Sequence, residues 1–152
     1  MTISVRAATP DDVRVVGELY VELRNHHARL DPEALRYRTD DDVWMEWARG
    51  LLDDAGQHIR LALEDHDVVG LTCLEFVRKP WGIACEIHTL IVREGARGKG
   101  VGEALLRDAE GRACSEGARG MRVDVLSAND EGRRFYEERG FKTSAVRYAL
   151  DF

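Results

Sequence analysis

Apolar residues recur along the chain with two different periods, which separate the expected strands from the expected helices. Strand-like runs of alternating or continuous apolar positions occupy residues 3–7, 58–63, 68–77, 84–92, 121–126 and 141–150. Apolar stripes at helical spacing, or segments with helix start and stop residues, occupy residues 9–23, 39–52, 100–116 and 129–139. The predicted order is therefore β-α-α-β-β-β-α-β-α-β.

The connections between these segments indicate how the strands are arranged. The short polar link from Glu64 to Asp67 has the length of a hairpin turn, so the strands on either side are expected to pair antiparallel. Hairpins combined with helices between strands are typical of an α/β layered domain (mixed α+β) with one central mixed sheet. The acidic run Asp40–Asp42 is best interpreted as the first turn of a helix, and no metal site is expected.

The size and charge of the chain limit the classes of function. With 152 residues it fits one domain, and no linker divides residues 1–152. A formal net charge of −6 argues against a nucleic-acid binder with a broad basic face. No apolar run reaches the roughly 18–20 residues that span a bilayer, so no membrane partner is expected.

The N-terminus and the cysteines indicate the compartment. The segment Met1–Arg6 lacks a basic region followed by an apolar stretch, which is the pattern of a secretion signal. Cys73, Cys85 and Cys114 are odd in number and widely spaced, as is typical of buried thiols in a reducing compartment. We therefore expect a cytoplasmic protein.

The segment from Arg93 to Gly102 is the most informative part of the chain. An apolar strand runs into a loop whose glycines open an amphipathic helix. Successive N–H groups at a helix N-terminus bind anions, and glycine leaves room for a phosphate. Arg97 and Lys99 add positive charge. These features predict a site for a phosphate-bearing ligand.

Other interpretations of this loop stay open on its residues alone. A P-loop requires Gly-Lys-Ser/Thr, which residues 100–102 do not supply. A dinucleotide site would follow the first strand of a parallel sheet, whereas this loop follows the fourth strand. The glycines could also serve only a tight turn.

Two motifs together resemble those of a known family. Arg97-x-x-Gly100-x-Gly102, between an apolar strand and Ala104-Leu105-Leu106, closely resembles the acetyl-CoA signature of the GNAT superfamily of N-acetyltransferases. The segment Asn129–Phe141 is similar to the family's later motif, with an aromatic-Tyr pair and a closing Gly-Phe. The order of elements also matches over nearly the whole chain. Gly132 departs from the pattern, since the family often has alanine there.

The resemblance implies a GNAT fold with a partly splayed sheet, and acetyl-CoA as co-substrate. In such a protein the fourth and fifth strands separate, and the pantetheine arm of coenzyme A lies between them. The loop would hold the pyrophosphate and Asn129 would bond the pantetheine. The implied contacts are Leu90, Ile91, Val92, Arg97, Gly98, Lys99, Gly100, Val101, Gly102, Asn129 and Tyr136.

The resemblance also implies roles in the reaction. Tyr136 is similar to the family residue that assists the departing thiolate, although it could equally be a core residue. An amine with a lysine-like pKa costs roughly 4–5 kcal/mol to deprotonate at neutral pH, so a base or a water relay is needed. Glu86 is the first candidate and His88 the second, although either could be merely solvated. Alternation places Glu86 and His88 on one face with Leu90 and Val92, and Ile87, Thr89 and Ile91 on the other.

The leading hypothesis is an acetyltransferase that moves an acetyl group from acetyl-CoA to an amine of a small molecule or protein. The amine would attack directly in a ternary complex. A rival hypothesis is a non-catalytic acyl-CoA-binding or partner-regulating module on the same fold. His26 and His27 could line the acceptor pocket. The resemblance also suggests a homodimer, with the last strand as a site of pairing.

Overall fold

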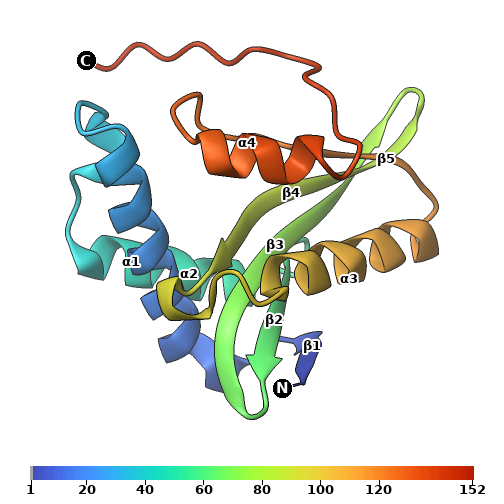
Figure 1. Cartoon of the computed structure of the whole chain (residues 1–152), viewed down its shortest axis with the longest axis horizontal. Coiled ribbons are helices and arrows are strands. Elements are labelled where there is room, and N and C mark those ends of the chain that lie inside the picture. Colours follow the sequence, from blue (N-terminus) through green and yellow to red (C-terminus); the bar gives the residue numbers. More distant parts are fainter. Residues whose placement is uncertain (1) are drawn as a thin grey trace.

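The computed structural model describes residues 2–152, which form one sheet between two layers of helices (Figure 1). The sheet order follows the chain, β1-β2-β3-β4-β5. All neighbouring strands are antiparallel except the parallel pair β4 and β5. The strands are β1 (Ile3–Ala7), β2 (His58–Glu64), β3 (Asp67–Lys79), β4 (Gly82–Val92) and β5 (Ala118–Val123). The predicted α/β class with one mixed sheet is confirmed.

The helices divide between the two faces of the sheet. They are α1 (Val13–Leu30), α2 (Asp41–Asp53), α3 (Val101–Ser115) and α4 (Asp130–Glu137). Leu19 of α1 and Ala48 of α2 share one buried cluster with Leu71 of β3. Leu106 of α3 and Tyr136 of α4 share another with strand residues of the opposite face. Within residues 2–152, no helix combines the length and the apolar character needed to cross a bilayer.

The start of α1 is fixed to the end of β1. Asp12 accepts hydrogen bonds from the Thr9 N–H at 2.7 Å and from the Arg6 guanidinium at 2.8 Å. The bond from Arg6 is the main reason that the pKa of Asp12 falls to about 2. This contact sets the direction of α1, whose later turns border the candidate site.

A bulge in β4 changes which of its side chains share a face. The register between β3 and β4 shifts at His88. Ile87 packs in the α3–α4 layer, whereas Thr89 contacts Tyr20 of α1. The predicted alternation is therefore wrong beyond Ile87, because a bulge inserts one residue and reverses the parity of those that follow. Glu86 and His88 do not share a face with Leu90 and Val92, which pack against the α3 side.

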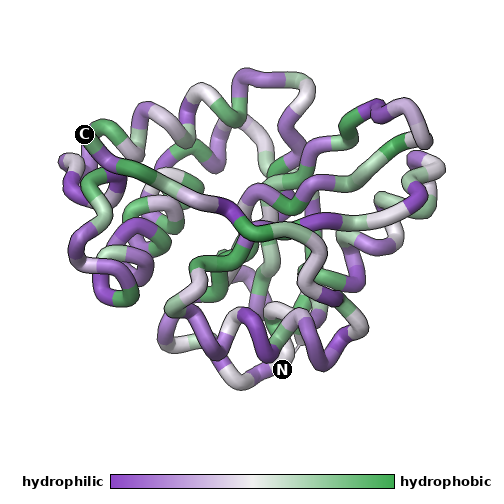
Figure 2. The backbone as a smooth tube through the Cα atoms, turned by 90° about the horizontal axis from the view of Figure 1, so that it is seen from above, coloured by the Kyte–Doolittle hydropathy of each residue, from purple (hydrophilic) through white to green (hydrophobic). Residues whose placement is uncertain are grey.

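The predicted last strand, residues 141–150, is absent. The final residues instead run as an extended trace across the molecule, from α4 toward the link between α1 and α2 (Figures 1 and 2). Arg147 forms an ion pair with Asp124, and the Asp151 carboxylate accepts a hydrogen bond from the Leu35 N–H at 3.1 Å. Within the described chain, β5 has no neighbour on its outer edge. The alternating pattern is real, but it has no partner strand here.

Candidate active site

The site lies where β4 and β5 separate. Their pairing ends at Ile87 and Val123, while β4 continues to Val92. The fifth strand begins and ends three residues earlier than predicted, so residues 124–126 leave the sheet and border the gap. A cavity of about 440 Å³, here called the gap cavity, occupies this space. Its size is in the usual range for small-molecule sites.

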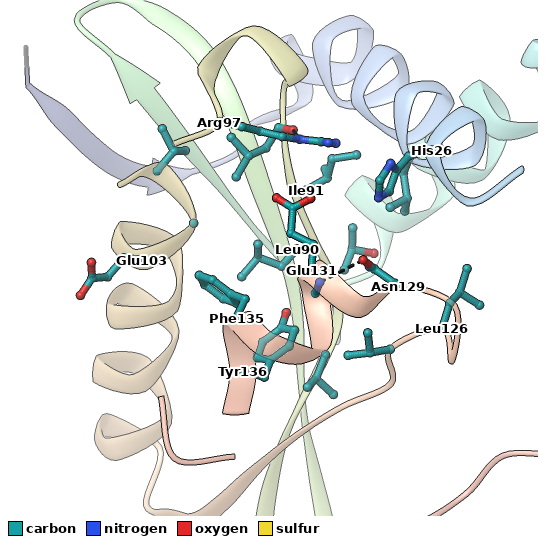
Figure 3. Close-up of a pocket in the computed structure, with 18 of the residues that line it drawn as sticks. His26, Leu90, Ile91, Arg97, Glu103, Leu126, Asn129, Glu131, Phe135 and Tyr136 are labelled. Atoms are coloured by element: carbon teal, nitrogen blue, oxygen red, sulfur yellow. Dashed lines mark hydrogen bonds between the residues drawn. The ribbon is translucent and has the colours of Figure 1, made fainter. Parts of the chain in front are cut away.

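Most of the predicted cofactor-binding residues line the gap cavity. They come from β4, from the loop after it and from α4 (Figure 3). The predicted residues that line it are His88, Leu90, Ile91, Val92, Arg97, Gly98, Gly100, Val101, Gly102, Asn129 and Tyr136. Lys99 is not among them, and its ammonium lies 3.8 Å from the Glu64 carboxylate at the end of β2. Glu86 lies outside it as well.

The loop before α3 has the geometry of an anion site. Gly98 and Gly100 have φ values of +76° and +84°, which favour glycine, and open space surrounds the position of a side chain at both. The N–H groups from residue 98 to residue 102 have no acceptor among the described residues. The positive end of the α3 dipole begins at Val101. Arg97 donates to the Val92 carbonyl at 3.2 Å, which holds its side chain across the cavity (Figure 3).

Asn129 caps α4 and explains the glycine that departs from the family pattern. Its Oδ1 accepts a hydrogen bond from the Gly132 N–H at 2.9 Å, which leaves the Nδ2 amide free to donate. A Cβ atom at position 132 would lie 2.5 Å from that Nδ2. Glycine at this position therefore keeps the Asn129 amide in place.

Tyr136 points its hydroxyl into the gap cavity (Figure 3). Its ring packs edge-on against Phe135 and Phe141, with centroids 5.1 and 5.2 Å away. Burial raises the pKa of the phenol well above its ordinary value of 10. The hydroxyl is thus protonated at neutral pH, and it can donate a hydrogen bond far more readily than it can lose its proton.

A second cavity, here called the acidic cavity, adjoins the first. It has a volume of about 310 Å³. Its lining residues are Glu75, Val77, Glu86, Ile87, His88, Asp124 and Arg147. His88 and Asp124 line both cavities, so the two meet at the point where β4 and β5 separate. His88 Nε2 lies 2.7 Å from Glu75 Oε1, and this hydrogen bond lowers the pKa of Glu75.

Several residues of the two cavities were not predicted from the sequence as site residues. Glu75, Asp124 and Arg147 belong to no motif, and only the fold brings them together. Glu131 and Phe135 line the gap cavity from α4 (Figure 3). Helical spacing could have found these two, since they lie on the same side of α4 as known motif positions.

Two further histidines border the gap cavity, and two of the cysteines are buried. His26 and His27, considered for the acceptor wall, line the gap cavity. Burial lowers the pKa of His27 to about 4, so it is neutral at physiological pH. Burial raises the pKa of Cys73 and of Cys85 to about 11, so both are thiols rather than nucleophilic thiolates. Among residues 2–152, no three side chains gather into a metal-binding group.

This combination of fold and site is that of acyltransferases that take their acyl group from coenzyme A. The sequence matches the acetyltransferase (GNAT) family over residues 17–141, and the chain belongs to this family. It is also 32% identical to the aminoalkylphosphonate N-acetyltransferase of Salmonella typhimurium strain LT2, over 95% of this chain and 88% of that protein. The protein is an N-acetyltransferase.

Solved structures share the fold. The ribosomal-protein-alanine N-acetyltransferase of Brucella melitensis biovar Abortus 2308 superposes with a TM-score of 0.77 at 20% identity, covering 99% of this chain and 100% of that one. A transcriptional regulator from Bacillus halodurans C-125 gives a TM-score of 0.78 at 21% identity, with the same coverage of 99% and 100%. At these identities the likeness establishes the fold, and the acceptor must be argued from the site.

Proposed function

We propose that the protein binds acetyl-CoA in the gap cavity and acetylates a small cationic amine that enters through the acidic cavity. Two cavities that meet at His88 and Asp124 carry this proposal, because a direct transfer needs thioester and amine to approach from different sides. One cavity has an anion-binding loop at its mouth, and three of the seven residues that line the other are carboxylates.

The gap cavity fits coenzyme A through main-chain groups more than through charge. The free N–H groups of residues 98–102 and the Arg97 guanidinium would hold the diphosphate. The residues of β4 beyond Ile87 lack a strand partner on the β5 side, so their main-chain groups would bond the pantetheine amides. The Asn129 Nδ2 amide would donate to the same arm.

The placement of the two candidate bases favours His88 over Glu86. His88 lies at the junction of both cavities, whereas Glu86 lines the acidic cavity alone. Glu75 orients the His88 ring through the 2.7 Å hydrogen bond. In the reaction, His88 accepts the proton of the amine, the nitrogen bonds to the acetyl carbon and the carbon–sulfur bond breaks. The Tyr136 hydroxyl donates a hydrogen bond to the departing sulfur and keeps its own proton, so the released thiolate is protonated from solvent.

The charge of the acidic cavity favours an ammonium group. Glu75, Glu86 and Asp124 supply negative charge, and the Arg147 guanidinium is already paired with Asp124. An acceptor with a second ammonium group could replace Arg147 at Asp124. The Salmonella relative is named for an aminoalkylphosphonate, whose anionic group would instead need a free cation such as Arg147.

The test is an acceptor panel in which release of free thiol from acetyl-CoA is followed. The panel contains a linear diamine, an aminoalkylphosphonate, an amino acid and a peptide with a free N-terminal amine. We expect the diamine to be acetylated most efficiently, and Asp124→Asn to raise the KM for the diamine about two- to fivefold, because the lost charge contact is largely exposed to solvent. Preference for the aminoalkylphosphonate would overturn the cationic acceptor. Binding of coenzyme A without thiol release on the whole panel would support the non-catalytic rival.

We further propose that the protein works in the cytoplasm as a homodimer. Buried thiols with raised pKa values suit a reducing compartment. The exposed apolar side chains of the final residues suit contact with a second copy of the chain.

A further inference from the structure

A buried pair of hydroxyl groups borders the gap cavity. The Tyr20 hydroxyl of α1 lies 3.0 Å from Thr89 Oγ1 of β4, and the two residues are only 3% and 8% exposed. Thr89 lines the gap cavity, beyond the last pair between β4 and β5. It follows His88, the residue at which the two cavities meet. Thr89 therefore stands where thioester and amine must come together.

The chemistry of the two hydroxyl groups sets the direction of their hydrogen bond. A phenol is a stronger acid than an aliphatic alcohol, so Tyr20 donates and Thr89 accepts. Burial raises the pKa of Tyr20 well above its ordinary value, which keeps the proton on the phenol. The Cys73 thiol, opposite Thr89 on β3, lies near the Tyr20 hydroxyl and adds to the rise in the pKa of Tyr20, while its own proton is donated to Gln57 Oε1 at 3.3 Å rather than to Thr89.

This direction leaves the proton of Thr89 available. A threonine hydroxyl has one proton and two lone pairs, and Tyr20 occupies one lone pair. Among residues 2–152, Thr89 Oγ1 has no hydrogen-bond partner other than the Tyr20 hydroxyl. A buried donor without an acceptor costs about 1–3 kcal/mol, so a ligand atom that accepts this proton is favoured. The bond from Tyr20 also polarises the Thr89 hydroxyl and makes it a better donor.

We propose that Thr89 donates a hydrogen bond to the carbonyl oxygen of the acetyl thioester, and that Tyr20 is the positioning residue that orients it. The inference rests on the proposed function, because it requires acetyl-CoA in the gap cavity. When the amine attacks, the carbonyl electron pair moves onto the oxygen, where the Thr89 proton stabilises it. The pair returns as the carbon–sulfur bond breaks, and Thr89 keeps its proton throughout.

The central variant is Thr89→Val, which removes the hydroxyl and keeps the shape of the side chain. We expect kcat to fall on the order of 10²-fold, as for loss of one oxyanion donor, with the Kd for coenzyme A unchanged. Thr89→Ser retains the donor and should stay within about threefold of wild type. Tyr20→Phe should fall between the two, because Thr89 keeps its hydroxyl and loses its orientation.

Thr72→Val is the matched control. Thr72 lies on the neighbouring strand β3, is fully buried and has a hydroxyl with no hydrogen-bond partner. Thr72→Val makes the same chemical change in the same sheet but outside both cavities, so kcat should not change. An equal loss of kcat in Thr72→Val and Thr89→Val would show a structural effect and overturn the inference.

A second readout needs no acceptor amine. The infrared stretch of ¹³C-labelled acetyl-CoA reports hydrogen bonding at its carbonyl, and we expect a higher frequency in Thr89→Val and Tyr20→Phe than in wild type. Unchanged frequency and kcat in the folded variants would overturn the role of Thr89 while leaving the acetyltransferase intact. Failure of the wild type to bind acetyl-CoA would instead reject the proposed function. If Thr89→Val does not fold, kcat and the carbonyl stretching frequency of Tyr20→Phe are compared with those of the wild type.

Discussion

At the scale of single residues, the environment of Tyr136 limits what its hydroxyl can do. The ring is buried among aromatic neighbours, and its pKa lies well above 10. A coenzyme A thiol has an ordinary pKa near 8.5, so full proton transfer from this phenol is uphill. A hydrogen bond to the developing thiolate needs no such transfer. We therefore expect Tyr136 to act by stabilising charge rather than as a proton source.

Tyr136→Phe tests this role. We expect kcat to fall at least about tenfold, because the departing sulfur loses its donor, with the Kd for acetyl-CoA little changed. Stopped-flow or steady-state thiol release would measure kcat, and calorimetry the Kd. Tyr148→Phe, at a 91% exposed tyrosine, is the matched control. Wild-type turnover in Tyr136→Phe would remove this residue from the mechanism.

Residues that belong to local motifs could be predicted, and residues gathered by the fold could not. Arg97 and Gly100 could be predicted from the loop chemistry of neighbouring positions, and Asn129 from the resemblance to the family motif. Glu75 and Asp124 share a cavity although 49 positions separate them (124 minus 75), and no local pattern records that proximity. The proposed diphosphate end of the cofactor site can thus be predicted from sequence, whereas the acceptor side cannot.

At the scale of elements, α4 contains a glycine that lowers its helix propensity but leaves room for the Asn129 amide. Glycine at position 132 costs about 1 kcal/mol relative to alanine inside a helix. In return, the Asn129 side chain occupies the space that a Cβ atom would fill and caps the helix. A cap of this kind contributes about 1 kcal/mol, so the two effects nearly cancel in stability.

Gly132→Ala should therefore change ligand affinity more than stability. We expect a thermal midpoint close to wild type and a several-fold weaker Kd for coenzyme A, because the Asn129 amide is displaced from the gap cavity. Calorimetry and thermal unfolding would measure the two. Gly111→Ala, inside α3 with open space around its Cβ position, should stabilise the protein and leave affinity unchanged. An unchanged Kd in Gly132→Ala would show that Asn129 does not hold the cofactor.

Element order could be predicted more securely than element edges and faces. Turns and caps mark where strands and helices begin, so the order up to α4 was confirmed. Alternation could not show the bulge at His88, because bulges arise from pairing between strands that sequence does not display. The shift of β5 has a similar origin, since residues 124–126 alternate like a strand yet leave the sheet at the gap.

At the scale of the whole molecule, the final residues point polar side chains toward the protein and apolar side chains toward solvent, which is the reverse of the usual arrangement. Arg147 and Asp151 point their polar groups at the rest of the chain, through Asp124 and the Leu35 N–H. The alternate positions face solvent, and all four are apolar: Val146, Tyr148, Leu150 and Phe152 are 70%, 91%, 79% and 105% exposed. A period-two stripe that is apolar outward is what an extended segment shows when its partner is another molecule. The strand predicted at 141–150 was wrong for the single chain because its pattern has no partner within that chain.

The exposed stripe predicts a homodimer in which this segment contacts a second copy. Aromatic side chains each bury about 150–250 Å² on contact, so Tyr148 and Phe152 with their two aliphatic neighbours approach the roughly 800 Å² per partner of a standard interface. We expect sedimentation velocity to show a dimer at micromolar concentrations, and the double variant Tyr148→Ser/Leu150→Ser to shift it to monomer. Val43→Ser/Trp47→Ser on α2, also exposed and apolar, should remain dimeric. A monomeric wild type would contradict the dimer, and an unaffected dimer in the Tyr148 and Leu150 variant would place the interface elsewhere.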